Sequence, residues 1–296
     1  MKFGHKNYGL TLRRITLIDT LYVNGCSWTA GNELDEDPIF VEHLVNMGMK
    51  LCNTEMQGVV NVKDSNDNLV GVAAEFWNEF TWAKNLADKL NLTLVNDSVG
   101  GSSNDRIVRT TIDYVRTLSS EQRKQTLIVI GWSTPERNEI CINDATDIPY
   151  WYRFNATQKF SQSLTLDHAL SPMQVKLIDE AHKLWVSNVL NLHERIHCYF
   201  RGVYLLSNLL ENLGIRYYFF NALPCCDEHN INIQHNFGSW LDWHNNHSNI
   251  RRMDNNMYHF VHEHNYKIAP GGHPLVEAHA AWAEELLRDL TTKNIL

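Results

Sequence analysis

Residues 20–31 read TLYVNGCSWTAG, an apolar run that ends in Asn-Gly and is followed, one residue later, by a serine. The run at 20–24 has little polar alternation, which is typical of a strand buried on both faces of a parallel sheet. Similar runs occupy residues 92–96, 126–132 and 215–223. Helical periodicity fills residues 80–90, 104–118, 173–213 and 274–290. This alternation predicts an α/β fold, a three-layer α/β/α sandwich with a parallel sheet of about five strands.

Composition narrows the class of protein. The chain has 296 residues, with 26 Lys plus Arg against 34 Asp plus Glu, so its net charge is -8. Neutralising a phosphate backbone requires a basic face, so we expect no nucleic-acid partner. No apolar run reaches the roughly 18 residues of a membrane span, and residues 1–20 lack the pattern of a signal peptide. Because the six cysteines are scattered, we expect a reduced, cytoplasmic protein without a membrane partner.

Three long segments follow the ends of predicted strands, at about residues 30–74, 134–171 and 224–270. They have the composition of irregular loops, whereas the returns from helix to strand are short. All the extra chain therefore lies at the carboxyl edge of the sheet, where open α/β sheets bind ligands. We expect one domain over residues 1–296, with these insertions building a substrate-binding surface.

Four residues at this edge have the chemistry of acyl transfer. Ser27 follows the first strand, and a serine there can present its hydroxyl to a carbonyl group. Gly101 lies in the Gly-Gly turn after the second strand, where free N–H groups can stabilise an oxyanion. Ser133 follows the third strand, and His273 lies in a Gly-Gly-His-Pro loop before the last helix.

In content and order these segments resemble the SGNH (GDSL-type) hydrolases, which have a flavodoxin-like sandwich, and the variants encoded by tailed bacteriophages in particular. The resemblance implies that Ser27 is the nucleophile and His273 the general base. It also implies that Ser27, Gly101 and the residue at 133 form the oxyanion hole. Neither a metal nor an organic cofactor is implied. If the chain is phage-encoded, we expect it in the host cell cytoplasm or associated with the virion.

Two departures from the family pattern affect catalysis. The family has an asparagine where this chain has Ser133, which has a shorter reach, and the loss of an oxyanion donor costs about 10²–10³ in rate. The family's acid lies two or three residues before the histidine, where this chain has Pro270 and Gly271. The chain is therefore a dyad, a triad completed from elsewhere, or inactive. Asp227 and Asp254 are the candidates for the third member.

Other residues offer competing interpretations. His193 and His197 form an HExxH pattern, which binds zinc in one class of metalloproteases. With fifteen histidines, chance alone produces such a pattern in roughly one in twenty chains of this composition. Arg195 would also put a positive charge between the ligands, so we expect no metal. Cys26 and His279 are interpreted as packing residues rather than as site residues.

The sequence predicts a serine ester hydrolase that removes acyl groups from a carbohydrate or another small ester. Aromatic and amide side chains suited to sugars supply the expected substrate-binding residues, which are Trp28, Asn104, Trp151 and Trp243. The alternative is a non-catalytic module that keeps the fold for binding or for virion association. The oligomeric state is not predicted.

Overall fold

A parallel four-stranded sheet forms the centre of the computed structural model, which describes residues 18–53, 60–143, 149–154, 172–184, 186, 191–225 and 233–296. Its strand order is β5-β1-β6-β9. The bounds are Thr20–Gly25 for β1, Thr93–Asn96 for β5, Thr126–Trp132 for β6 and Arg216–Asn221 for β9. The chain leaves β1 for one neighbour and later returns to the other side of β1, so the sheet has its topological switch point beside this strand.

The described sheet has one strand fewer than the expected five. A single parallel bridge joins Phe219 of β9 to Ile250 at the position of a fifth strand. Phe219 donates its N–H to the carbonyl of Asn249 and accepts from the N–H of Arg251, at 3.0 and 2.8 Å. The pairing stops there because turns flank this short segment on both sides.

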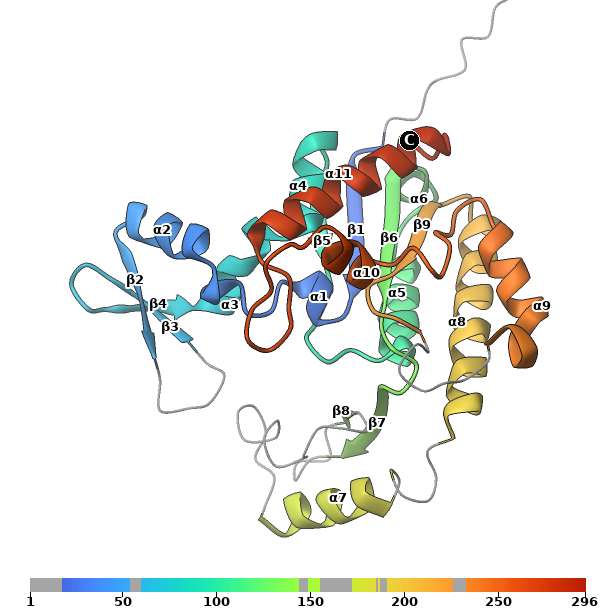
Figure 1. Cartoon of the computed structure of the whole chain (residues 1–296), viewed down its shortest axis with the longest axis horizontal. Helices are drawn as coiled ribbons and strands as arrows, with labels where there is room; N and C mark the ends of the chain where they lie inside the picture. The colour runs from blue at the N-terminus through green and yellow to red at the C-terminus, as the bar shows by residue number, and fades with distance from the viewer. Residues whose placement is uncertain are drawn as a thin grey trace, which may run out of the picture.

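Helices cover both faces of the sheet, which confirms the predicted α/β/α sandwich (Figure 1). On one face lie α4 (Trp82–Leu90) and α11 (Val276–Thr292). On the other lie α5 (Asn104–Thr117) and α8 (Leu192–Asn212). Residues 173–213, expected to form one or two helices, include α7 (Pro172–Leu184), which ends before α8 begins. A short helix, α6 (Ser120–Gln125), leads into β6.

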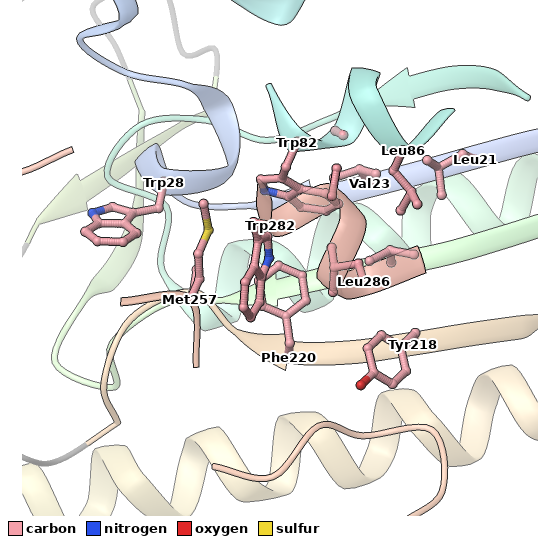
Figure 2. Packing of buried hydrophobic residues seen from close by; sticks show 14 of the residues in the cluster. Leu21, Val23, Trp28, Trp82, Leu86, Tyr218, Phe220, Met257, Trp282 and Leu286 are labelled. Atoms are coloured by element: carbon pink, nitrogen blue, oxygen red, sulfur yellow. The ribbon is translucent and has the colours of Figure 1, made fainter. Parts of the chain in front are cut away.

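Alternate side chains of the strands fill two separate cores. Leu21, Val23 and Phe220 pack with Trp82 and Trp282 under α4 and α11 (Figure 2). The neighbouring strand residues face α5 and α8 in the second core, which contains Tyr22, Ile128, Phe219, Phe200 and Val203. Strands buried on both faces need apolar residues at every position, which explains the near-continuous apolar runs in the sequence.

The three insertions contain regular structure, so the expectation of irregular loops was wrong. The first begins at the end of α1 (Ser27–Ala30) and contains η1 (Leu34–Glu36), α2 (Pro38–Asn46) and an antiparallel sheet of β2 (Met49–Asn53), β3 (Val60–Asp64) and β4 (Leu69–Val72). It leads into α3 (Ala73–Trp77) and η2 (Asn78–Phe80). The second contains the hairpin of β7 (Asn138–Asn143) and β8 (Pro149–Phe154). The third contains α9 (Ile233–Asn246) and α10 (Met257–Glu263).

The first insertion has its own small core. Phe40, Leu44, Val62 and Ala73 are buried together between α2, α3 and the antiparallel sheet. The continuous apolar run in this segment, LVGVAA at residues 69–74, is divided between β4 and α3. Among the described helices, none combines the length and the apolar character that crossing a membrane requires.

Candidate active site

A tight turn carries the chain from β1 into α1 and sets the position of Ser27. Gly25 is paired in register with Gly131 of β6. A Cβ atom on Gly25 would lie 2.3 Å from the Thr29 hydroxyl oxygen, and one on Gly131 would lie 2.7 Å from the same atom. The Asn24 side-chain oxygen accepts the N–H of Gly25 at 2.8 Å. The two glycines therefore let α1 fold back against the strand ends, with Ser27 as its first residue.

Ser27 has free hydrogen-bonding groups. Its side chain is largely buried, with 4% of the residue exposed. Within the described residues, neither its N–H nor its hydroxyl has a hydrogen-bond partner, and the hydroxyl is not sealed in the interior. The N–H is unpaired because the first residues of a helix have no intrahelical acceptor. Ser27 therefore has both a nucleophilic oxygen and a backbone donor available.

Gly101 offers a second backbone donor. Its φ is 74°, which is in the left-handed region, and there is open space where a Cβ atom would be. In the described part of the chain its N–H has no acceptor. The loop is anchored next to β1, because Val99 donates its N–H to the carbonyl of Gly25.

Ser133 and Asn104 hold each other in place. The N–H of Ser133 donates to the Asn104 side-chain oxygen at 2.8 Å, and the Asn104 amide donates to the Ser133 carbonyl at 3.0 Å. The Ser133 hydroxyl is buried without a partner among the described residues. Because the Ser133 N–H is already engaged with Asn104, the hydroxyl is the donor that Ser133 could offer to an oxyanion. Asn104 is 5% exposed and its amide is engaged, so it positions the end of β6 and is not free for the expected substrate contact.

His273 is paired with a carboxylate that the sequence did not identify. Its Nδ1 lies 2.8 Å from Oε2 of Glu33. No described residue bonds to its Nε2, which is not sealed in the interior. Because the carboxylate accepts a proton from Nδ1, Nε2 of the neutral ring has its lone pair free. This is the arrangement that a general base requires.

The local backbone brings these two side chains together. Glu33 has φ 66°, an uncommon conformation outside glycine, and it precedes η1. A Cβ atom on Gly271 would lie 1.9 Å from the Glu33 carboxylate, so a larger residue there would displace it. Asn32 donates its N–H to the carbonyl of Ser27 at 3.1 Å. His273 therefore lies beside the segment that directly follows Ser27.

Asp37 fixes the same two segments to each other. It is 4% exposed, and its carboxylate accepts the N–H of Ile39 at the start of α2 and the N–H of Val276 at the start of α11, both at 2.8 Å. The positive ends of two helix dipoles meet at one negative charge. The loop that carries His273 is thus held against the first insertion (Figure 1).

Neither predicted candidate for the acid is the partner of His273 in the described structure. Asp254 is exposed and paired with Arg252 at 3.0 Å, and the hydrogen bond from Arg252, together with its positive charge, lowers the pKa of the Asp254 carboxyl group. Asp227 lies outside the described residues. Glu33 was missed because 240 positions separate it from His273 and because it stands in the acidic run Glu-Leu-Asp-Glu-Asp, in which nothing distinguishes one carboxylate from the others.

Two of the three tryptophans expected to bind substrate pack against other residues. Trp28 is buried in the core beside Tyr258, with ring centres 5.5 Å apart (Figure 2). Trp243 of α9 packs edge-on against Tyr204 of α8, at 5.2 Å. The side chain of Trp151 lies outside the described residues. The aromatic residues that suggested a sugar site therefore include a core residue and a helix-packing residue.

Two histidines outside the pair are held neutral by burial. His279 is fully buried, and its Nδ1 accepts the N–H of Trp82 at 3.2 Å. Desolvation, with a smaller effect of nearby His273, lowers the pKa of His279 to about 3. Burial likewise lowers the pKa of His244, which lies 3.0 Å from the hydroxyl of Tyr199, to about 4. Both residues serve packing in this structure.

The HExxH pattern is part of a helix-packing surface. The rings of His193 and His197 both lie against Phe237 of α9, at 5.8 and 4.7 Å. Glu194 is paired with Arg201, and Arg195 with Asp105. In the part of the chain that the structure describes, no three His, Cys, Asp or Glu residues are grouped so that they could hold a metal ion. Cys26, the residue directly before α1, is buried in the core.

A protein-family model, described as "Family of unknown function (DUF6071)", matches residues 60–295. This match includes Gly101, Ser133 and His273 but begins after Ser27 and Glu33. No curated protein matches the chain.

Several solved structures align with most of the chain at low identity. A putative lipolytic protein of the G-D-S-L family from Desulfitobacterium hafniense is 10% identical, with a TM-score of 0.36, over 92% of this chain and 99% of that one. A lipase from a goat rumen metagenome is 12% identical, with a TM-score of 0.42, over 92% and 97%. A carbohydrate esterase family 2 enzyme with a carbohydrate-binding domain, from Corynascus thermopiles, is 11% identical, with a TM-score of 0.40, over 93% and 66%.

Proposed function

This chain belongs to the family of unknown function DUF6071, and we propose that it is a serine hydrolase that cleaves ester bonds through an acyl-enzyme. The observation that carries the proposal is the pairing of His273 with Glu33 at 2.8 Å, with Nε2 of the histidine left unpaired. A partly buried carboxylate–imidazole pair beside the segment that carries a serine with a free hydroxyl supplies a nucleophile, a base and a group that orients the base.

In the proposed reaction, the Ser27 oxygen attacks the ester carbonyl carbon while its proton passes to Nε2 of His273. The carbonyl oxygen becomes an oxyanion and accepts hydrogen bonds from the N–H groups of Ser27 and Gly101, and from the Ser133 hydroxyl once it rotates toward the site. The C–O bond then breaks, and the leaving alcohol takes the proton from His273. Water, activated by the same imidazole, hydrolyses the acyl-enzyme and restores the Ser27 hydroxyl.

Glu33 stabilises the positive charge that forms on the imidazole ring and holds the ring in one tautomer. The absence of an acid before His273 was the main reason to consider a non-catalytic module. Glu33 supplies a carboxylate beside His273 from a different part of the chain, so the missing acid no longer argues against catalysis. Ser27 and His273 are not hydrogen-bonded to each other in the structure, and such contacts often form only when substrate binds.

The test is hydrolysis of 4-nitrophenyl acetate by purified full-length protein, followed by release of nitrophenolate. We expect Ser27→Ala and His273→Ala each to lower kcat/KM by at least about 10³, because each removes a member of the catalytic unit. Ser120→Ala, an exposed serine at the start of α6, is the matched control and should behave like the parent protein. Equal rates for Ser27→Ala and the parent, with both folded by circular dichroism, would rule out this function.

A further inference from the structure

A cavity of about 360 Å³ opens between the segment that follows α1 and the loop that follows β5. Its lining residues are Ala30, Asn32, Trp77, Asn78, Asn96, Ser98, Val99 and Gly100. The volume is near the lower end of the roughly 300–1,000 Å³ that is typical of small-molecule sites. It suits one compact group better than a long chain.

The cavity adjoins the groups proposed to react. Ala30 lies three residues after Ser27 in α1, so the two share one face of that helix. Gly100 is next to Gly101, and Asn32 is next to Glu33. Gly100 also makes room for the Asn32 amide, because a Cβ atom there would lie 2.6 Å from its nitrogen. A substrate whose carbonyl group is at Ser27 and Gly101 can therefore extend into this cavity.

The lining is polar and neutral. The lining residues include three with amide side chains, one serine and Trp77, and none with a charged side chain. Asn96 donates to the Asn78 side-chain oxygen at 2.8 Å, which leaves the amide hydrogens of Asn78 without an acceptor among the described residues. The Asn32 amide also has no hydrogen-bond partner there, and the Ser98 hydroxyl is buried without one.

These groups indicate which half of an ester the cavity accepts. An alkyl chain would bury the unpaired amide groups of Asn32 and Asn78 without giving them new hydrogen bonds, which is unfavourable. A ring that carries hydroxyl groups can pair with them and pack its C–H groups on Trp77. A carboxylate would add a negative charge close to Glu33 in a chain of net charge -8.

We propose that this cavity binds a neutral sugar ring, which is the alcohol half of the ester cleaved at Ser27. This inference rests on the proposed function, because it assigns a substrate class to the same site. The chain is then an esterase for short acyl groups on neutral carbohydrates. Its selectivity comes from Asn32, Asn78 and Trp77.

The kinetic test compares three acetate esters at one pH: a mono-O-acetylated methyl glucoside, the corresponding glucuronate, and 4-nitrophenyl acetate. We expect kcat/KM for the neutral glucoside to exceed that for the glucuronate by about tenfold or more. Asn78→Ala should lower the ratio of glucoside to 4-nitrophenyl acetate activity by about 10- to 100-fold. Asn212→Ala, which removes an exposed asparagine at the end of α8, is the matched control and should leave that ratio unchanged.

A binding test separates this inference from the catalytic proposal. Ser27→Ala protein should bind unacetylated methyl glucoside, detected by ligand-observed NMR, and the Ser27→Ala/Asn78→Ala double variant should lose this binding. Hydrolysis of 4-nitrophenyl acetate with no preference for the neutral glucoside, and no glucoside binding, would overturn the sugar site and leave the esterase standing. Glucoside binding that depends on Asn78, in a protein that hydrolyses no ester, would support the sugar site and refute the esterase.

Discussion

Glu33→Gln tests the role of the carboxylate beside His273 with a small change in shape. Glutamine keeps an oxygen that can accept the Nδ1 proton, but it removes the negative charge 2.8 Å from the ring. At that distance, the attraction between a carboxylate and the imidazolium formed during the reaction is about 1.5 kcal/mol in a water-like medium and about 6 kcal/mol at an effective dielectric constant of 20.

Exposure places the expected effect toward the lower part of that range. The Glu33 side chain is 32% exposed and that of His273 is 19% exposed, so solvent screens the pair in part. We take about 2–3 kcal/mol, which corresponds to a loss of about 30- to 150-fold in kcat/KM. This loss is smaller than the roughly 10⁴ observed when a fully buried triad acid is replaced by its amide.

The assay is hydrolysis of 4-nitrophenyl acetate, with thermal melting as a check on folding. Glu36→Gln, an exposed acid three residues further along in η1, is the matched control and should be within about twofold of the parent. Gly271→Ala provides a second perturbation, because its new methyl group would displace the Glu33 carboxylate, and it should lower the rate in the same direction. A folded Glu33→Gln protein that is as fast as Glu36→Gln would refute the reasoning.

Two predictions concern stability. Asp37→Asn should lower the free energy of unfolding in urea by about 1–2 kcal/mol, because it removes the charge that accepts the N–H groups of Ile39 and Val276 at two helix starts; no change would contradict this capping role. Burial lowers the pKa of His279 to about 3, whereas its unfolded value is about 6.5, so the unfolded chain binds the extra proton between these pH values. The free energy of unfolding should therefore fall as the pH drops below about 6.5, and this residue should contribute about 1.4 kcal/mol per pH unit to the slope. His279→Asn keeps an acceptor for the N–H of Trp82 and should remove that part of the slope, measured by urea titrations at about pH 4.5 to 7.5.

The central sheet could be predicted from the sequence because its strands are buried on both faces. The predicted run at 126–132 coincides with β6, and the runs at 20–24 and 92–96 each differ from their strands by one residue at one end. The run at 215–223 extends past β9 by one residue at its start and two at its end. Continuous apolar character is a local property of the chain, so it can be identified without knowledge of the tertiary structure.

The antiparallel sheet of the first insertion could not be predicted in the same way. Its strands are short and mostly half-buried, and only Val62 of β3 lies fully in the small core. Pairing with neighbouring strands, rather than local composition, makes these segments extended. At the position of a fifth strand in the central sheet, Ile250 alone pairs with β9, so no regular strand forms there.

The candidate site was predictable where its residues follow strands and not where folding brings distant segments together. Ser27, Gly101 and His273 have recognisable neighbours in the sequence. The contact between Glu33 and His273 depends on an uncommon backbone conformation at Glu33 and on the absence of a side chain at Gly271. Similarly, only the fold shows that Trp28 belongs to the core and that the amides of Asn32 and Asn78 line a cavity.

The most direct test of the central claim is the site at which a fluorophosphonate reacts with the parent protein, mapped by peptide mass spectrometry. Only a serine activated by a neighbouring base reacts quickly with this probe, and its phosphorus then remains bound to the serine oxygen. The account predicts one adduct, on Ser27, that forms much more slowly in Glu33→Gln and is absent in Ser27→Ala. An unlabelled Ser27 in folded protein, or an adduct that forms equally fast after His273→Ala, would contradict it.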